Sequence, residues 1–511
     1  MASFSKLNSA VLVGLHARHV LVESFVDAQA VIHEIDIVGL GDTAIKESKK
    51  RVKSAISSNK LNIPQGRIVI NLAPGNLKKE GTLLDLPIAV AILACGNDVE
   101  REIPPGLFFF GELGLNGVLR RVQGMLPLLI ALSKSKEPKT IVIPQENVEE
   151  AKLVPEIDVR LAADLWEVLS FLNGGELPRV PSDRALEPDL PIEDDFSEIH
   201  GQYQAKRALE IAAAGGHNVL MKGPPGSGKT MLAKRLPGLL PPLREEGFLE
   251  TASIYSIVGL LNSEILRRKR PFRSPHHSAS RAAIVGGGVD SRPGEVSLAH
   301  NGVLFLDEIP EFSRDVLEAL RQPLEDRIVS VARAKGTLTY PASVALVAAQ
   351  NPCPCGNYGD PDLVCTCSAR DIVNYNRKIS GPLLDRIEIV IEVPRLTYKE
   401  YTSKEGGEGS ASIRERVVKA RETQNRRFRK THHRGFTNAS LNSKMIQEYC
   451  RLDGEAETLL EQAVNRYHLT GRGINKVLKV ARTISDLEGS ETIQAVHLAE
   501  AIQYREKITE G

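Results

Sequence analysis

The sequence predicts an α/β protein of several domains, with a parallel sheet in its middle part and helices at its end. Its 511 residues exceed what a single hydrophobic core organises, so two to four domains are expected. From about Phe196 to Pro394, apolar strand-like runs alternate with helical stretches, which is typical of a parallel sheet covered by helices. Beyond residue 412 the hydrophobic pattern is almost entirely helical.

Changes in composition divide the chain. Residues 1–172 mix short β-branched runs with helical patterns, which predicts a compact α/β domain. Residues 173–195 hold four prolines and seven acidic residues against two arginines, so they are expected to form an exposed linker. We expect a core domain over 196–395 and a helical domain over 396–511, with a flexible break at 403–412.

The bulk composition limits the class of protein. Hydrophobic residues at 42% and charged residues at 25% are ordinary for a globular protein, and with a net charge of +1 any nucleic-acid binding must come from local basic patches. No apolar run reaches the roughly 18 residues that would span a bilayer, and the N-terminus lacks the pattern of a secretory signal. We therefore expect a cytoplasmic protein without membrane contact. Six cysteines in so long a chain do not predict a disulfide framework.

The stretch HNVLMKGPPGSGKTMLAKRL (217–236) places an apolar strand, a glycine-rich loop and a helix in succession. It fits the P-loop pattern G-x-x-x-x-G-K-[ST], in which backbone N–H groups wrap nucleotide phosphates at a helix N-terminus. Lys229 is expected to reach the β- and γ-phosphates of ATP, and the Thr230 hydroxyl to ligate Mg²⁺. The expected nucleotide-binding residues are Gly223, Pro224, Pro225, Gly226, Ser227, Gly228, Lys229 and Thr230.

Two later apolar strands end in polar residues. GVLFLDE (302–308) ends in two acids, of which Asp307 is expected to hold Mg²⁺ and Glu308 to accept the proton of the attacking water. SVALVAAQNP (343–352) ends in the amide of Asn351, which could orient that water or sense the γ-phosphate. Together with the upstream P-loop, these strands predict ATP hydrolysis.

Two arginines complete the expected catalytic set. Arg386, in SGPLLDRIEIVIEV (380–393), precedes a strand and could act as an arginine finger on a neighbour's ATP. The alternative is a surface salt bridge with Asp385. Arg472, in TGRGINKVLKVAR (470–482), begins a helix and is placed to touch the γ-phosphate from a lid.

The P-loop, LFLDE, QNP, LLDR and TGRG, in this order, resemble an AAA+ ATPase. The stretches 270–288, 293–312 and LRQPLEDR (320–327) resemble the magnesium-chelatase-like branch, specifically the YifB/ComM family of bacterial proteins, over nearly the whole chain. This resemblance implies an AAA+ P-loop core with a helical lid, ATP and Mg²⁺ as cofactors, and a homo-hexamer in which Arg386 acts on the neighbour's nucleotide. It also implies a DNA motor, a branch-migration helicase of homologous recombination during natural transformation. Gln350 stands where the family more often has methionine, which should not affect the chemistry.

Basic residues near the core are candidates for DNA contact. The long interval between the P-loop and Asp307 predicts an insert, which includes the basic run 267–281, and residues 329–342 are expected to form a hairpin. In related ring ATPases such inserts project toward the central pore, where basic side chains would contact phosphates. The alternative is a solvated or nucleotide-adjacent basic surface, and the basic stretch 413–434 is a weaker candidate because it can equally cap the lid. The candidate DNA contacts are Arg267, Arg268, Lys269, Arg270, Arg273, Arg333 and Lys335.

The N-terminal stretches 76–94 and 110–132 resemble the proteolytic domain of Lon-type proteases. The family pattern, laid over KEG and GEL, places Leu83 at the serine nucleophile and Leu126 at the lysine base. Neither leucine can do that chemistry, so this alignment excludes peptide hydrolysis by the dyad. We expect a Lon-protease-like α/β domain that serves as a structural or DNA-contacting collar; Lys78, Lys79, Arg120 and Arg121 leave DNA contact open.

Four of the six cysteines lie in CPCGNYGDPDLVCTC (353–367). Their thiolates could close a tetrahedral Zn²⁺ site, although the C-x-C pairs are tighter than the usual C-x₂-C. Reduced, uncoordinated thiols are the main alternative, and a disulfide is disfavoured in a reducing cytoplasm. The candidate ligands are Cys353, Cys355, Cys365 and Cys367.

Three functions remain open at this point. The first is an ATP-driven DNA motor. The second is a magnesium-chelatase-type ATPase subunit that remodels a protein partner, against which the Lon-like domain argues, since the chelatase subunit that the core resembles lacks one. The third is an ATP-dependent protein-interaction scaffold.

Overall fold

The computed structural model describes residues 3–31, 34–96, 98–135, 137, 139–181, 194–288, 291–333, 336–360, 363–398, 400, 407–429 and 437–505. The chain forms two compact units, each considered by itself. The first unit comprises Met1–Leu186 together with Ala252–Ser263, and the second comprises Glu187–Thr251 and Glu264–Gly511. A short segment from the middle of the sequence thus belongs to the first unit.

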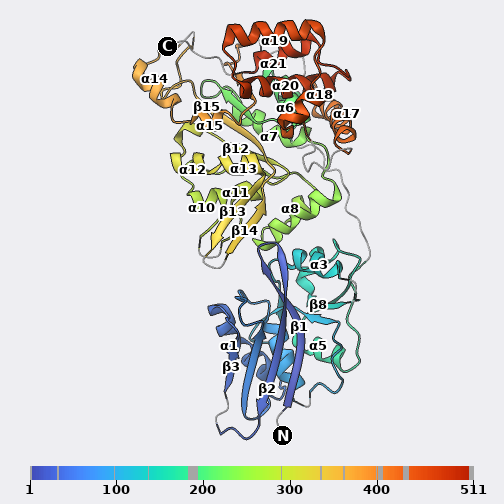
Figure 1. The fold of residues 1–511 in the computed structure, drawn as a ribbon. Coiled ribbons are helices and arrows are strands. Elements are labelled where there is room, and N and C mark those ends of the chain that lie inside the picture. The colour runs from blue at the N-terminus through green and yellow to red at the C-terminus, as the bar shows by residue number, and fades with distance from the viewer. Residues whose placement is uncertain are drawn as a thin grey trace. The chain divides into compact units, whose positions relative to one another are not determined.

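A seven-stranded mixed sheet forms the first unit, in the order β3-β4-β2-β1-β5-β8-β9. Its long strands β1 and β2 pair antiparallel from end to end (Figure 1). Helix α2, with the sequence DLPIAVAILA, is buried almost throughout, because a helix that is apolar on all sides must lie inside a core. Helix α1 has an exposed face and begins at Asp42, whose carboxylate accepts the Ile45 N–H.

The elements of the first unit are β1 (Ser3–Val13), β2 (His16–Asp27), β3 (Ile35–Val38), α1 (Thr43–Ser58), β4 (Arg67–Ala73), α2 (Asp85–Ala94), β5 (Leu107–Phe109), β6 (Glu112–Leu113), β7 (Leu119–Arg120), α3 (Met125–Ser133), β8 (Thr140–Pro144), α4 (Val148–Ala151), β9 (Asp158–Ala162) and α5 (Leu165–Leu172).

A five-stranded parallel sheet forms the centre of the second unit, in the order β11-β12-β15-β10-β16. The three inner strands are almost completely buried, as expected of a parallel sheet covered on both faces. Because all strands run the same way, the loops that follow them meet at one edge, where ligands bind in such sheets. The strands are β10 (Val219–Lys222), β11 (Phe272–Arg273), β12 (Val303–Leu306), β15 (Ala345–Gln350) and β16 (Ile389–Glu392).

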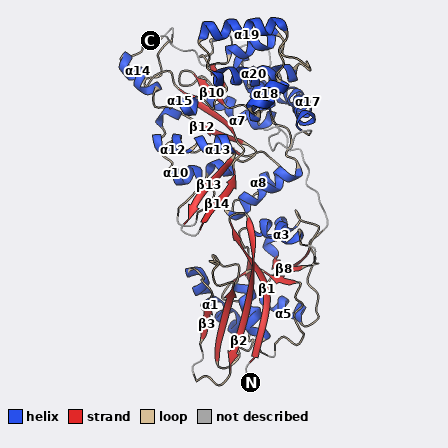
Figure 2. Cartoon of the chain, in the orientation of Figure 1, coloured by secondary structure: helices blue, strands red, loops and turns tan. Residues whose placement is uncertain are grey.

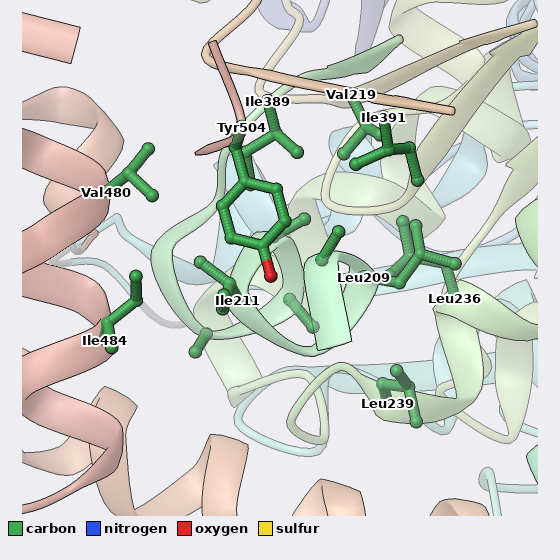
Figure 3. Close-up of a cluster of buried hydrophobic side chains, with 14 of the residues drawn as sticks. Leu209, Ile211, Val219, Leu236, Leu239, Ile389, Ile391, Val480, Ile484 and Tyr504 are labelled. Carbon is green, nitrogen blue, oxygen red and sulfur yellow. The ribbon is translucent and has the colours of Figure 1, made fainter. Parts of the chain in front are cut away.

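The C-terminal part of the second unit is helical, as the hydrophobic pattern predicted (Figure 2). Its helices share one apolar core with the sheet: Figure 3 shows Val480 and Ile484 of α20, together with Tyr504, in a cluster that includes Ile389 and Ile391 of β16. These helices are α17 (Ser410–Phe428), α18 (Ser443–Tyr449), α19 (Gly454–Tyr467), α20 (Gly471–Leu487) and α21 (Ala495–Gln503).

The chain contains further strands and helices beyond residue 202. Strands β13 (Ile328–Arg333) and β14 (Gly336–Pro341) pair antiparallel, which confirms the hairpin predicted at 329–342.

None of the helices in the described ranges has both the length and the apolar character that crossing a bilayer requires. The remaining helices are α6 (Tyr203–Gly215), α7 (Lys229–Leu239), α8 (Glu245–Ile257), α9 (Ser263–Leu266), α10 (Arg281–Val285), α11 (Glu295–Leu298), α12 (Arg314–Ala319), α13 (Arg321–Asp326), α14 (Ala369–Asn376) and α15 (Gly381–Leu384).

Candidate nucleotide-binding and metal sites

The glycine-rich loop joins β10 to α7 at the carboxyl edge of the parallel sheet. A Cβ on Gly223 would lie 2.1 Å from the carbonyl oxygen of Val393, so only glycine fits beside the end of β16. Gly226 and Gly228 have φ of +77° and +91°, where glycine is favoured, and a Cβ at either position would meet no atom of the described chain within 4 Å. The loop therefore leaves space in front of its backbone at the N-terminus of α7, the position that binds phosphate in such loops.

Lys229 is the first residue of α7 and is only 7% exposed. Its ammonium donates to the carbonyl oxygens of Gly223 at 2.7 Å and Pro224 at 2.8 Å, and to Oδ1 of Asn351 at 3.3 Å. Burial lowers the pKa of Lys229, although Asp307 and Glu308 act in the opposite direction. The structure thus brings together the P-loop lysine and the amide that follows β15, two of the residues that the sequence predicts for the ATP site.

The two predicted Mg²⁺ ligands are adjacent. The Thr230 hydroxyl donates to Oδ2 of Asp307 at 2.9 Å, so a hydroxyl and a carboxylate from α7 and the end of β12 converge on one point. Hydroxyl and carboxylate oxygens are suitable ligands for Mg²⁺. Glu308 is exposed and has φ of +48°, and its N–H donates to Oδ1 of Asp307 at 3.0 Å. A non-glycine residue in this left-handed conformation is typical of functional sites, because the surrounding structure must hold it there.

The two predicted arginines lie at the other edge of the sheet. Asn218, the residue before β10, donates its side-chain N–H to the carbonyl oxygen of Arg386 at 2.7 Å. The Arg386 guanidinium pairs with Glu325, whereas Asp385 pairs with Arg472 at 3.1 Å. The alternative that Arg386 pairs with Asp385 is therefore not what the structure shows.

The length of β10 separates these arginines from the P-loop. Five residue steps lead from Asn218 to Gly223, and at a rise of about 3.3 Å each they span roughly 16 Å. Arg472 is held at the same edge as Arg386, because its partner Asp385 is the neighbouring residue, and its side chain is 78% exposed. Within one chain, the P-loop and the two arginines thus face different edges of one sheet.

The four cysteines of the 353–367 loop come together in space. We call them the four-cysteine cluster: Cys353, Cys355, Cys365 and Cys367. Their sulfur atoms all lie within 4.8 Å of one another. Cys353 Sγ is 3.3 Å from Cys355 Sγ and 3.7 Å from Cys365 Sγ, and the last two sulfurs are 3.6 Å apart. A tetrahedral ion with Zn–S bonds of about 2.3 Å would place its sulfurs roughly 3.8 Å apart. The cluster therefore fits a metal ion in both donor type and spacing.

The Cys355 thiol has a lowered pKa. Hydrogen bonds from the backbone N–H groups of Asn357 and Thr366 and from the Cys353 thiol hold its pKa at about 5, whereas burial and the neighbouring sulfurs raise the pKa of Cys367 to about 12. The deprotonated thiolate is the form that binds metal. Cys95 and Cys450 are buried elsewhere and take no part in the cluster.

Sequence reasoning missed two residues that shape the site. Gln202 donates its side-chain N–H to the carbonyl oxygens of Pro394 at 2.7 Å and Ser227 at 3.4 Å, and so braces the P-loop from the residue before α6. The sequence gives little indication of this role for Gln202, because a single polar residue before a helix can serve many purposes. Glu325, the partner of Arg386, lies in LRQPLEDR. This stretch supported the family resemblance, but its sequence did not predict a role for Glu325.

Three family models match consecutive parts of the chain: "Subunit ChlI of Mg-chelatase" at residues 23–147, "Magnesium chelatase, subunit ChlI" at 195–401 and "Magnesium chelatase, subunit ChlI C-terminal" at 407–505. The chain is 44% identical to Competence protein ComM of Haemophilus influenzae, over 92% of this chain and 91% of that protein. It is 42% identical to the uncharacterized protein YifB of Escherichia coli, over 98% and 97%. The chain belongs to the YifB/ComM family.

As a YifB/ComM protein, the chain has an AAA+ core of the magnesium-chelatase type. The basic run 267–281 lies within the matched residues of this core. Most of the predicted DNA contacts are engaged within the chain. Arg268 pairs with Glu245 at 2.6 Å and Lys269 with Glu264 at 2.7 Å. Arg270 donates to two backbone carbonyl oxygens at 2.6 and 2.5 Å. Arg268 and Lys269 are thus held by carboxylates and Arg270 by carbonyl oxygens, and all three fasten the insert to the rest of the chain.

The other candidates differ in their surroundings. Arg273 forms two hydrogen bonds to the carboxylate of Glu295, at 2.6 and 2.7 Å. Arg267 is exposed. The Arg333 side chain and the whole of Lys335, at the tip of the β13–β14 hairpin, lie outside the described residues.

The basic stretch 413–434, described as far as residue 429, contributes α17 of this YifB/ComM chain. Arg416 pairs with Glu210 at 2.5 Å, and Arg421 donates to the carbonyl oxygen of Ala213 at 2.7 Å. Both partners lie on α6, so this part of the stretch fastens α17 to the core, in line with the capping alternative.

In the first unit, the two positions aligned with the protease dyad are apolar and buried, with Leu83 8% and Leu126 0% exposed. The Leu126 N–H donates at 3.4 Å to the Ser256 hydroxyl, which itself donates at 2.5 Å to the buried carboxylate of Glu150. Burial raises the pKa of Glu150. Lys79, considered above for DNA contact, is fully buried and donates to three backbone carbonyl oxygens, so its charge does not reach the surface.

Proposed function

We propose that this protein is an ATP-dependent, homo-hexameric DNA motor, a branch-migration helicase that acts in homologous recombination during natural transformation. One observation carries the proposal: a chain with a P-loop at one edge of its sheet and two arginines at the other edge completes an ATPase site only with a neighbour. A ring of subunits related head to tail supplies that neighbour at each interface. The similarity to a competence protein supports the choice of DNA as substrate.

In the proposed site, the P-loop backbone from Gly223 to Thr230 cradles the phosphates of ATP. Lys229 would exchange its carbonyl partners for phosphate oxygens, and Thr230 and Asp307 would hold Mg²⁺, which supplies charge neutralisation. Glu308 accepts the proton of the attacking water, because its carboxylate is exposed beside Asp307. Asn351, next to the Lys229 ammonium, orients that water or reports the γ-phosphate.

Arg386 and Arg472 then act on the nucleotide of the adjacent subunit. Both are at the edge that lacks a P-loop, and both are held by carboxylates, Glu325 and Asp385, whose side chains are 64% and 44% exposed. The Arg472 pair is exposed on both sides and therefore weak, so Arg472 can transfer to phosphate at little cost. The Arg386 side chain is 22% exposed and also donates to the Pro382 carbonyl oxygen, so its transfer requires both contacts to break. Positive charge aimed at the transferring phosphoryl group is what the reaction requires.

The two units divide the work. We propose that residues 196–395 form the AAA+ core, apart from the segment Ala252–Ser263, which belongs to the first unit, and that 396–511 form its lid. The linker 173–195 joins them to a Lon-protease-like domain over 1–172 that lacks the dyad and acts as a collar. DNA phosphates would contact the β13–β14 hairpin, with Arg333 and Lys335, and the exposed Arg267. A cytoplasmic location provides ATP, Mg²⁺ and DNA together.

Zn²⁺ is the ion we propose for the four-cysteine cluster. Four sulfur donors at tetrahedral spacing suit zinc, and a site closed by four protein ligands is structural and leaves no position for substrate. Zinc would therefore support the fold of the loop and take no part in hydrolysis.

ATPase rates of the purified protein, measured with and without single-stranded DNA, test the proposal together with strand exchange on four-way DNA junctions. A DNA motor hydrolyses ATP faster on DNA, moves the junction only with ATP, and loses specific activity on dilution below its assembly concentration. If DNA neither binds nor stimulates hydrolysis, the motor proposal is wrong. The alternative, a magnesium-chelatase-type subunit that remodels a protein partner, is favoured by the three chelatase family matches and would then become the better account.

A further inference from the structure

The loop that carries the four-cysteine cluster lies directly against the nucleotide-binding loop. A Cβ built on Gly356, the residue after Cys355, would be 2.5 Å from Cδ of Pro225 in the P-loop. The backbone of Gly356 therefore packs on the Pro225 ring at van der Waals contact. A shift of Cys355 would move this support away from the phosphate-binding backbone.

The same loop starts beside the P-loop lysine. Asn351 accepts from Lys229, and Cys353 follows two residues later. The Cys353 side chain is fully buried, and its sulfur accepts the Tyr358 N–H at 3.3 Å. The position of the Asn351 amide is thus fixed from its C-terminal side by a cysteine of the cluster.

The middle of the loop is fastened at a third point. Asp360, whose side chain is 4% exposed, pairs with Arg395 at 3.4 Å. Arg395 lies two residues after Val393, the residue on which Gly223 of the P-loop packs. The loop between the two cysteine pairs therefore contacts both the tip of the P-loop and the segment beside its first glycine.

We infer that a metal ion in the four-cysteine cluster clamps the 353–367 loop against the P-loop, so that occupancy of the metal site sets the affinity of the nucleotide site for ATP. The inference rests on the proposed zinc binding and extends it from a local brace to control of the ATP site. Without the ion, nothing covalent joins the two cysteine pairs. The support of Pro225 and the position of Asn351 would then be lost together, whereas four metal–sulfur bonds hold both.

Metal removal from the full-length protein tests this directly. Zinc per chain is measured by mass spectrometry, and affinity for a fluorescent ATP analogue by anisotropy, on protein as purified, after chelation and dialysis into Mg²⁺ buffer, and after zinc is restored. We expect one zinc per chain and a dissociation constant that rises about tenfold or more on removal and recovers on restoration. Stoichiometric zinc whose removal leaves the affinity unchanged would overturn the clamp while the zinc site stands. Well under one metal ion per chain would overturn both.

Two glycines in the loop provide a matched pair of variants that keep all four thiols. Gly356 has φ of +83° and faces Pro225, whereas Gly359 has φ of +79° and a Cβ there would meet no atom of the described chain within 4 Å. Gly356→Ala and Gly359→Ala thus carry similar backbone strain, but only the first pushes the loop off the P-loop. We expect normal zinc content in both, and about tenfold weaker binding of the ATP analogue in Gly356→Ala alone. Equal affinities of the two variants would contradict the proposed contact.

Discussion

Replacing Arg386 by alanine should abolish ATP turnover and leave ATP binding intact. The Arg386 backbone is held at the start of β10 and Gly223 begins the P-loop at its end, about 16 Å away at 3.3 Å per residue. An extended arginine side chain covers less than half of that distance, so Arg386 does not come within hydrogen-bond range of a phosphate at the P-loop of its own chain. Removal of an arginine finger lowers kcat by about 10³–10⁵-fold, and we expect a loss in that range.

Mixing two inactive variants tests whether the arginine acts between subunits. Lys229→Ala cannot hold ATP but supplies Arg386, and Arg386→Ala holds ATP but lacks the arginine. In a one-to-one mixture of independent head-to-tail interfaces, about one interface in four unites the two intact halves, so about a quarter of wild-type activity should return. If Arg386→Ala alone turns over ATP at the wild-type rate, or the mixture stays inactive although mixed oligomers form, the reasoning is refuted.

Glu325→Gln is the control for the resting position of Arg386. The Glu325 side chain is 64% exposed, and an ion pair of this kind is worth only about 0.2–1 kcal/mol. Its removal should therefore change the ATPase rate by no more than about fivefold. A loss as large as that of Arg386→Ala would show that the pair itself, and not the free guanidinium, is needed.

Three further outcomes follow from the structure. Glu308→Gln should bind ATP but lower turnover by about 10²–10⁴-fold, because the exposed carboxylate that takes the proton is gone; normal single-turnover rates would exclude Glu308 as the base. Arg267→Ala should weaken DNA binding and reduce its salt dependence, whereas an unchanged salt slope would remove this arginine from the DNA surface. Burial lowers the pKa of His217 from 6.5 to about 3, so protonation of this imidazole favours the unfolded chain. The contribution of neutral His217 to the free energy of unfolding is fully present above pH 6.5 and falls by up to about 1.4 kcal/mol per pH unit below it. His217→Gln should make urea unfolding midpoints less sensitive to pH between 6.5 and 5, and equal sensitivity would contradict this assignment.

The geometry of the candidate nucleotide site could be predicted from sequence because its parts are local. A strand, a glycine-rich loop and a lysine in one run fix their own geometry, and Asp307 and Asn351 follow apolar strands that a parallel sheet brings to the same edge. The prediction of a cysteine cluster also depended on residues close together in the chain. In each case the sequence spacing limits the spatial distance.

What the sequence could not show depends on contacts between distant residues. The charge of Arg268 predicts a DNA contact, but the sequence does not show that Glu245, 23 positions earlier, pairs with it. Lys79 reads as a surface lysine, yet carbonyl oxygens of three separate residues enclose it. The edge at which Arg386 and Arg472 lie follows from strand direction and helix packing, which no single motif encodes.

The discontinuous first unit has a consequence for how the protein is made. Ser256, whose hydroxyl binds Glu150 and receives the Leu126 N–H, lies beyond the P-loop in the chain, in the segment Ala252–Ser263. During synthesis, when domains usually fold in order from the N-terminus, this unit stays incomplete until that segment has left the ribosome. The nascent N-terminal sheet therefore remains incomplete, with Glu150 lacking its Ser256 partner, while α6, β10 and α7 of the second unit are synthesised. A single proteolytic cut in the linker 173–195 would likewise release an N-terminal fragment without the segment Ala252–Ser263, which forms part of the first unit.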